Sequence, residues 1–556
     1  CFRRKPAPRA APMPESTAEF ELKLLVPRSA RTAVRAALAG RGAKPQTRRL
    51  VAHYFDTADR RLALAGMSLR LRREGRQWVQ TLKAGGDTVL ARFEHEVRRP
   101  DATLDAAAHA GTTVGERMAG LLADGEPLLE SYGTDVRRTV RKLRTRGALV
   151  ELALDEGRIA AADSALGICE LEFELLSGSA SAMLALAERW RARFGLLVDP
   201  RSKAERGDLL AQGIVPAPVR RAMPVCLRRK VDVAEAWRSV LDECLAQILV
   251  NAIGLGASVG VEGRATKAGA PLPAADRADL VHQLRIGLRR LRSAIRLFRG
   301  WVAPPPEAIG AGARDLFRAL GALRDQDVLA QAIEPALQRA GAPASAATPA
   351  GPASLAVVAA GAAPVPADAP ARGDEVAALI AADETQRYLL ALVAWRCGLD
   401  EAPTPSAGGP EAQVPVGDAR GDDAAPAPLA PRARRRLARW QGAITSEATR
   451  FAQLDDAARH ALRRRAKRLR YASEFVESLF SGGEMRRFLK RLQAAQQALG
   501  ELSDLALVAQ RYGSEPDGDP RDWFVLGWVA ARREVVIAQA AAALAALGER
   551  HPFGKR

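Results

Sequence analysis

Cysteine, aromatic residues and long apolar runs are all scarce in this chain of 556 residues. The five cysteines are scattered, odd in number and free of C-x-x-C spacing, so they predict neither a disulfide framework nor a zinc site. They favour a reducing compartment. No apolar run reaches the roughly 18 residues that a membrane span needs, and the first fourteen residues contain no apolar signal core. A cytoplasmic protein that does not use a membrane is therefore expected.

Aromatic residues make up 5% of the chain and never form a run interleaved with arginine, which disfavours recognition through stacked bases. Basic residues are abundant instead: 83 lysines and arginines face 64 acidic residues, a formal charge of +19. This surplus predicts a polyanionic partner. The scarcity of aromatics favours a phosphate polymer over nucleic acid, although a nucleic-acid binder with basic helices is an alternative.

The period of the hydrophobic pattern divides the chain into two halves. Period-two alternation predicts strands at 18–26, 48–57, 67–74, 77–83, 88–99, 134–145, 148–157 and 166–176. Helices are expected at 28–40, 114–123 and 180–195. From about Val225 the period becomes helical. The predicted fold class is thus a strand-rich α+β domain followed by an all-α domain.

Composition sets the expected domain limits. They are a disordered leader (1–14), a strand-rich domain (15–212), a linker (213–225) and a helical domain (226–550). Two stretches rich in Ala, Pro and Gly, 341–373 and 401–431, are predicted to be flexible insertions, because they cannot bury enough apolar surface to become ordered. The segment between them, 374–399, is predicted to form one helix that ends at Gly398.

Charged residues alternate with apolar ones in STAEFELKLLV, near the start of the strand-rich domain. Glu19, Glu21 and Lys23 share one face of a strand, so two carboxylates and an ammonium could hold a hard cation beside an anionic ligand. An ordinary solvated strand face is the alternative, but the pattern recurs on later strands. The recurring charged positions are Arg70, Arg72, Lys83, Arg92, Glu94, Glu96, Arg138, Glu151, Asp155, Glu170, Glu172 and Glu174, with Lys203 in the closing SKAERG.

If the sheet curls so that these faces point inward, charges of both signs would line a tunnel. Such a tunnel is costly unless ligands satisfy it, a phosphate chain for the cations and metal ions for the carboxylates. Oxygen ligands without a cluster of Cys or His favour Mg²⁺ or Mn²⁺ over zinc.

The helical half contains an internal repeat. VHQLRIGLRRLRSAIRLF (281–298) matches RHALRRRAKRLRYASEFV (459–476), and LGALRD (320–325) matches LGELSD (499–504) at nearly the same offset, which predicts a duplication. Helical spacing places Arg285, Arg289, Arg292 and Arg296 in one stripe, and the second copy repeats Arg463, Lys467 and Arg470. Two solvated helix faces are the alternative to a basic channel for a long polyanion. His282 and His460 are candidate phosphate ligands or buried, satisfied histidines.

Residues 15–210 resemble the CYTH superfamily, the triphosphate tunnel metalloenzymes. The resemblance rests on E-x-E-x-K at Glu19–Lys23 and on YFDT (54–57), LRLR (69–72), TLK (81–83), LD (154–155) and the late E-L-E. It is closest to the inorganic triphosphatase branch, and implies an eight-stranded antiparallel tunnel. The implied metal ligands are Glu19, Glu21, Asp155, Glu170 and Glu172. The implied triphosphate ligands are Lys23, Arg70, Arg72, Lys83, Arg138 and Lys203. The implied catalytic residues are Glu19, Glu21, Lys23, Glu170 and Glu172.

The helical half resembles the CHAD domain, a unit of two four-helix repeats associated with inorganic polyphosphate, through V-H-x-x-R-x-x-x-R-R-L-R and L-G-x-L-x-D. The implied polyphosphate ligands are His282, Arg285, Arg289, Arg292, Arg296, His460, Arg463, Lys467 and Arg470. The two resemblances together imply metal-dependent hydrolysis of inorganic triphosphate to pyrophosphate and phosphate. Hydrolysis or cyclisation of an organic triphosphate (thiamine triphosphate or ATP) and non-catalytic polyphosphate binding are the alternatives.

Overall fold

The computed structural model describes residues 17–40, 44–85, 91–214, 218–260, 274–328, 333–343, 372–399, 428–513, 520–548 and 552–553. It divides into two compact units. The first comprises Cys1–Pro218, Ala252–Pro273 and Ala377–Thr404, and the second comprises Val219–Asn251, Ala274–Val376 and Pro405–Arg556. The predicted leader, 1–14, lies outside the described residues, as do 344–371 and 400–427 of the two predicted insertions.

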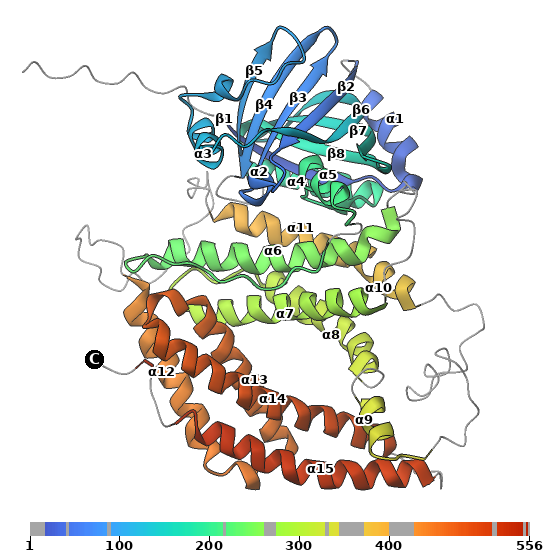
Figure 1. Ribbon diagram of the computed structural model, residues 1–556. Helices are drawn as coiled ribbons and strands as arrows, with labels where there is room; N and C mark the ends of the chain where they lie inside the picture. Colours follow the sequence, from blue (N-terminus) through green and yellow to red (C-terminus); the bar gives the residue numbers. More distant parts are fainter. Residues whose placement is uncertain are drawn as a thin grey trace, which may run out of the picture. The chain divides into compact units, whose positions relative to one another are not determined.

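The first unit is built on an antiparallel sheet of nine strands (Figure 1). These are β1 (Thr17–Leu25), β2 (Gln46–Asp56), β3 (Met67–Glu74), β4 (Gln77–Gly85), β5 (Ala91–Arg99), β6 (Leu129–Thr145), β7 (Ala148–Ala161), β8 (Ser164–Gly178) and β9 (Leu197–Val198). Their order is β5-β4-β3-β2-β6-β7-β8-β1-β9, and the first residues of β1, Thr17–Phe20, also pair with β5. The predicted antiparallel fold class is confirmed; the short β9 was not predicted.

Alternation along the strands separates an apolar face from a charged one. In β1, Leu22 and Leu24 are fully buried, whereas Glu21 and Lys23 line a cavity. The helices of this part are α1 (Arg31–Ala39), α2 (Arg61–Leu64), α3 (Thr113–Leu121), α4 (Ala180–Phe194) and α5 (Lys203–Ala211). Helix α4 packs on β1, β6, β7 and β8, and α5 packs on β6, β7 and β8.

Helix α5 was missed by the sequence analysis, although its capping box is visible in SKAE. The hydroxyl of Ser202 accepts a hydrogen bond from the amide of Glu205 (3.0 Å), and the carboxylate of Glu205 accepts one from the amide of Ser202 (2.6 Å). This cap makes Lys203 the first residue of α5. Gly207 lies so close to the ring of Tyr132 that a Cβ there would be 2.3 Å from it.

The second half of the chain is helical. Its helices are α6 (Val233–Gly260), α7 (Ala274–Phe298), α8 (Glu307–Val328), α9 (Glu334–Arg339), α10 (Arg372–Ala381), α11 (Asp383–Gly398), α12 (Leu429–Ala448), α13 (Asp456–Phe475), α14 (Gly482–Tyr512) and α15 (Pro520–Ala545). The single helix predicted at 374–399 is wrong, because the extended backbone of Ala382 (φ −56°, ψ 141°) separates α10 from α11. Among the described residues, one helical segment, Val233–Gly256, is long and apolar enough to cross a membrane, and 67% of its apolar window is buried.

Corresponding residues of the two predicted repeats occupy equivalent places. A Cβ on Gly321 would lie 3.6 Å from Nη1 of Arg285, and a Cβ on Gly500 would lie 3.8 Å from Nη2 of Arg463. Each arginine therefore lies against the glycine of the L-G pair in its own repeat, which supports the predicted duplication.

The close approach of α5 to Tyr132 generates a stability prediction. Gly207→Ala should lower the free energy of unfolding by about 1–3 kcal/mol, because the added methyl group collides with the Tyr132 ring. Gly120→Ala in α3 is the matched control, since nothing lies within 4 Å of its would-be Cβ, and it should be neutral or slightly stabilising. Urea unfolding of the two variants measures the difference; equal stability would show that α5 does not depend on this contact.

Candidate active site and basic cavity

Charged side chains of both signs line a cavity of about 300 Å³ among the strands. The predicted site residues that line it are Glu19, Glu21, Lys23, Arg70, Arg72, Lys83, Arg138, Asp155, Glu172 and Lys203. Glu170 is not among the residues that line the cavity, but its buried carboxylate contacts the ammonium of Lys203.

Strand register brings opposite charges together. Lys23 of β1 pairs with Glu172 of β8, and Arg138 of β6 pairs with Asp155 of β7. Asp155 is in turn paired with Glu170 of β8. Residues that are directly opposite on one face have neighbouring side chains, so this register assembles cations and carboxylates that are far apart in the sequence.

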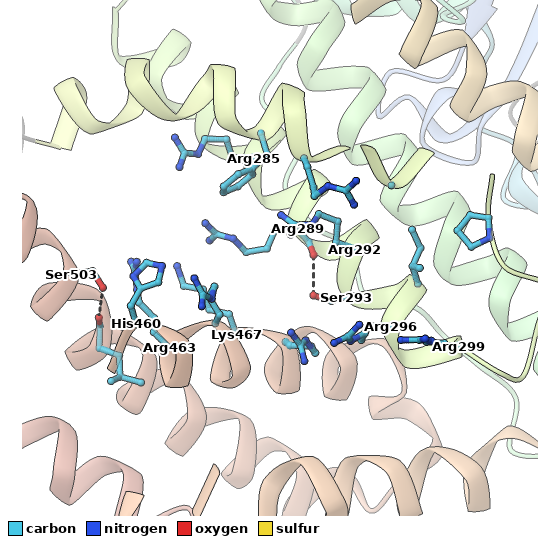
Figure 2. A pocket seen from close by; sticks show the side chains of 18 of the residues that line it. Arg285, Arg289, Arg292, Ser293, Arg296, Arg299, His460, Arg463, Lys467 and Ser503 are labelled. Atoms are coloured by element: carbon cyan, nitrogen blue, oxygen red, sulfur yellow. Dashed lines mark hydrogen bonds between the residues drawn. The ribbon is translucent and has the colours of Figure 1, made fainter. Parts of the chain in front are cut away.

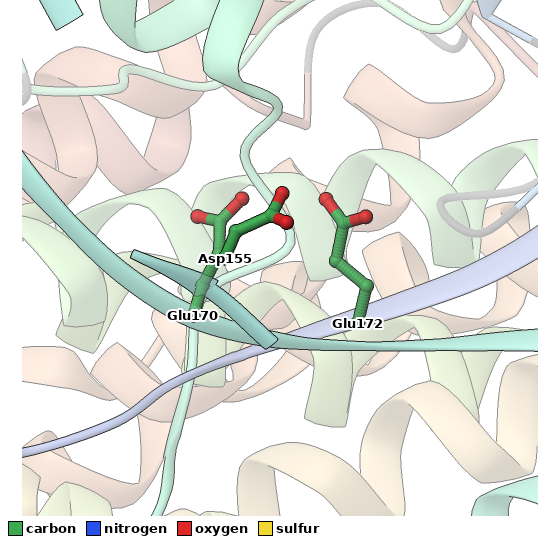
Figure 3. Close-up of side chains that lie close together, drawn as sticks. All are labelled: Asp155, Glu170 and Glu172. Carbon is green, nitrogen blue, oxygen red and sulfur yellow. The ribbon is translucent and has the colours of Figure 1, made fainter. Parts of the chain in front are cut away.

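Asp155, Glu170 and Glu172 form an acidic trio whose ligand oxygens all lie within 4.8 Å of one another (Figure 3). Arg138 donates two hydrogen bonds of 2.7 Å to the carboxylate of Asp155 and also contacts Glu172. The ammonium of Lys203 lies 2.5 Å from Asp155 and 2.8 Å from Glu172. All three carboxylates are buried, so their burial would be costly without these cations.

These contacts shift the pKa values of Glu172 and Lys203. Burial alone would raise the pKa of Glu172, but Arg138, Lys203 and Lys23 outweigh it and hold that pKa well below its usual value. Burial would lower the pKa of Lys203, yet Asp155 and the neighbouring glutamates raise it above the ordinary range. Three carboxylate oxygen donors this close together suit a hard cation such as Mg²⁺ or Mn²⁺.

Glu19 and Glu21, the other two predicted metal ligands, lie outside the acidic trio. Glu21 contacts the ammonium of Lys23. Glu19 lies 3.5 Å from Lys83, which also contacts Glu94. Burial and a hydrogen bond with Glu94 raise the pKa of Glu19 to about 8. The structure therefore brings three of the five predicted ligands together and places the other two beside cations of the same cavity.

Two residues of the site, Arg206 and Tyr54, were not among the predicted site residues. Arg206, one turn of α5 after Lys203, is buried and contacts Glu170. Recognising α5 from its capping box would have placed Arg206 beside Lys203, because residues three apart share a helix face. Tyr54 lines the cavity and stacks on Tyr132. Burial would raise the pKa of Tyr54, but Arg70 holds it below its usual value.

A larger basic cavity of about 1070 Å³ lies in the second unit (Figure 2). Ten arginines and Lys467 line it, against two acidic residues, Asp456 and Asp504. Arginines of α7 face basic residues of α13 across it. The predicted polyphosphate ligands that line it are Arg285, Arg289, Arg292, Arg296, His460, Arg463 and Lys467.

Two predicted ligands do not line the basic cavity, His282 and Arg470. Arg470 donates instead to Glu474 (2.6 Å) and Gln496 (3.1 Å). The basic lining residues that were not predicted are Arg299, Arg314, Arg459, Arg464 and Arg468. Arg464 and Arg468 follow Arg463 and Lys467 directly, so a wider stripe on α13 would have included them.

Burial and crowding of positive charge lower the pKa values of two basic residues in this cavity. Burial lowers the pKa of the Lys467 ammonium to about 6, with Arg289 and Arg463 contributing and Asp504 opposing. Burial and the neighbouring Arg464 and Arg463 also lower the pKa of His460. Lys467 is therefore largely neutral at pH 7 when no anion is bound.

The chain thus combines a sheet that holds a mixed-charge cavity with helices that surround a basic cavity. Residues 17–207 match the CYTH domain and residues 264–513 match the CHAD domain. The chain is therefore similar to a CYTH domain in its first part and to a CHAD domain in its second.

Individual relatives share parts of the chain. An inorganic triphosphatase of Haemophilus influenzae is 30% identical over 161 residues, which are 28% of this chain and 44% of that protein, so the match spans less than half of the relative. The crystal structure of the CHAD domain from the plant Ricinus communis is 24% identical and covers 60% of this chain and 98% of that one, with a TM-score of 0.41. A Hippeastrum protein described as a putative adenylyl cyclase with a dominant triphosphatase activity is 20% identical over 36% of this chain and 97% of that one (TM-score 0.27).

The acidic trio generates a prediction about divalent cations. Glu172→Gln should weaken Mn²⁺ binding about tenfold or more, because it removes one charged oxygen donor from the group. Glu156→Gln is the control: Glu156 follows Asp155 directly but pairs with Arg35 and Arg137 instead. Titration of Mn²⁺ by calorimetry or electron paramagnetic resonance measures both; similar losses in the two variants would refute the assignment.

Proposed function

We propose that the CYTH domain hydrolyses inorganic triphosphate to pyrophosphate and phosphate with Mg²⁺ or Mn²⁺. The observation that carries the proposal is the mixed-charge cavity, which is lined by seven basic side chains and by Asp155 and Glu172 of the acidic trio. Binding of an anion alone would need the cations but not buried carboxylates. The Haemophilus relative and the CYTH match support a triphosphatase at the level of the family.

In this proposal Lys23, Arg70, Arg72, Lys83 and Arg138 bind the phosphate oxygens and hold the chain of three phosphates in one orientation. The trio Asp155, Glu170 and Glu172 would hold the divalent cation, which would supply charge neutralisation and an activated water. Lys203 contacts all three carboxylates and fixes their positions. No covalent intermediate is needed, because water can attack the terminal phosphorus directly.

A phosphate-release screen tests this function. Purified protein is assayed with inorganic triphosphate, ATP, thiamine triphosphate and long-chain polyphosphate, each with Mg²⁺ and with Mn²⁺. Triphosphate should give the highest kcat/KM and no phosphate should appear without a divalent cation. A higher kcat/KM for ATP or thiamine triphosphate would show that the substrate is an organic triphosphate. Release of phosphate from none of the four compounds would favour a non-catalytic polyphosphate-binding protein.

Arg138 and Arg137 lie on opposite faces of β6, so one variant tests the cavity and the other is its control. Arg138→Met should lower kcat/KM for triphosphate about 10²–10³-fold, because a charge-assisted donor is lost from the cavity. Arg137→Met should stay close to wild type, since Arg137 is largely exposed and pairs with Glu156 (3.0 Å). Lys23→Ala and Glu21→Ala should likewise abolish release while circular dichroism stays unchanged. Wild-type turnover in these variants would remove the residues from the reaction.

For the CHAD domain we propose binding of inorganic polyphosphate in the basic cavity. Its cations far outnumber its acids, so its ligand must bring several negative charges. Arg285, Arg289, Arg463 and Lys467, on facing helices, are the central contacts of this proposal. Stronger binding of RNA or DNA than of polyphosphate at equal salt would favour the nucleic-acid alternative.

Lys467 makes the proposed polyphosphate affinity depend on pH. The free ammonium has a pKa of about 6, and a bound polyanion favours the protonated form, so binding above pH 6 must take up a proton. Affinity should therefore fall by up to about tenfold per pH unit above pH 6 until the pKa of the complex is reached. Fluorescence anisotropy with labelled polyphosphate at constant ionic strength measures this. Lys467→Arg should flatten the profile, whereas Lys490→Arg, on exposed surface outside the cavity, should not.

A further inference from the structure

Helix α11 lies within the stretch that matches the CHAD domain, yet it belongs to the compact unit of the sheet. It packs on α4 and on β9. Its buried side chains include Gln386, Leu389, Leu392 and Val393. A helix that separates two parts of the CHAD match therefore contributes to the core of the CYTH unit.

Two polar contacts fix α11 in place. The side-chain oxygen of Gln386 accepts a hydrogen bond from the amide of Val198 (2.7 Å), and its nitrogen donates to the carbonyl of Ile380 (2.8 Å). Gln386 is 3% exposed, so neither bond is easily replaced by water. The guanidinium of buried Arg191 donates to Asp383 (2.9 Å) as well as to Glu188.

The segment held by Gln386 leads directly to two cations of the mixed-charge cavity. Val198 of β9 pairs with Leu24, the residue after Lys23. The next residue, Asp199, is buried, donates its amide to the carbonyl of Lys23 (3.4 Å) and binds Arg201 (2.7 Å). Four residues further on, Lys203 contacts the acidic trio. A shift of β9 would thus move Lys23 and Lys203 together.

We propose that Gln386 and Asp383 of α11 are positioning residues for the cavity, so that the placement of Lys23 and Lys203 depends on a helix from within the CHAD stretch. This inference rests on the proposed triphosphate hydrolysis for its kinetic consequence but not for its structural one. Displacement of substrate-orienting groups by an ångström is enough to impair a reaction severely. The two lysines hold phosphate and the trio, so both KM and kcat should respond.

Gln386→Leu in the full-length protein tests the proposal, because it keeps the side-chain volume and removes both hydrogen bonds. We expect kcat/KM for inorganic triphosphate to fall about tenfold with a raised KM. Amide hydrogen exchange over residues 197–203 should become faster. Glu384→Ala is the control, since Glu384 lies on an exposed position of the same helix, and it should leave both measurements at wild-type values.

Wild-type kinetics together with wild-type exchange in Gln386→Leu would overturn the proposal. If the variant does not fold, the same measurements on Asp383→Asn decide, because Asp383 is exposed and its loss leaves Arg191 bound to Glu188. The exchange measurement also separates two failures. A wild-type protein that releases no phosphate refutes the proposed hydrolysis, while unchanged exchange at 197–203 refutes the role of α11.

Discussion

The mixed-charge cavity depends on one constraint: its buried cations and carboxylates must compensate one another. An unpaired carboxylate or ammonium at these depths would be strongly destabilising, and cross-strand register together with the basic residues of α5 supplies the partners. The compensation also has a consequence for ligands. A phosphate chain that binds the cations leaves the acidic trio without its partners, and a metal that binds the trio does the same to the cations. Binding of one ligand would therefore favour binding of the other, as the proposed hydrolysis of a metal-complexed triphosphate requires.

The basic cavity of the helical half obeys the opposite rule. Its cations far outnumber its acids, and part of the repulsion is relieved by a lowered pKa at Lys467 and by stacking of Arg285 and Arg289 over Phe317. An anionic ligand alone would neutralise the charge of such a cavity. The two copies of the repeat contribute unequally: Arg292 of α7 lines the cavity, while its counterpart Arg470 binds Glu474. The second copy therefore contributes Arg463 and Lys467 to the cavity, whereas its Arg470 pairs with an acid of its own helix.

The strands and the charged faces were predictable because alternation is a local property of the sequence. Glu19–Lys23 and the later charged positions could be identified before any contact was known, and most of the predicted cavity residues line it. What could not be predicted depends on tertiary contacts. The division of the predicted acids into a trio and two separate glutamates follows from register, and the role of Arg206 follows from the start of α5. The break at Ala382 has no glycine or proline to mark it.

The position of α11 shows why boundaries in sequence and in space differ here. The strand β9 has only two residues, and the amide of Val198 finds its acceptor in the side chain of Gln386, which lies 188 residues further along the chain. A buried amide without an acceptor is destabilising, so this edge of the sheet is complete only when α11 is present. The same holds for Arg191, which is 1% exposed and uses Asp383 as one of its two carboxylate partners. A domain cut at residues 213–225 would include every strand and every cavity residue, yet it would lack the groups that satisfy Val198 and half of those that satisfy Arg191. The sheet therefore depends for its own polar satisfaction on a helix from the middle of the helical half.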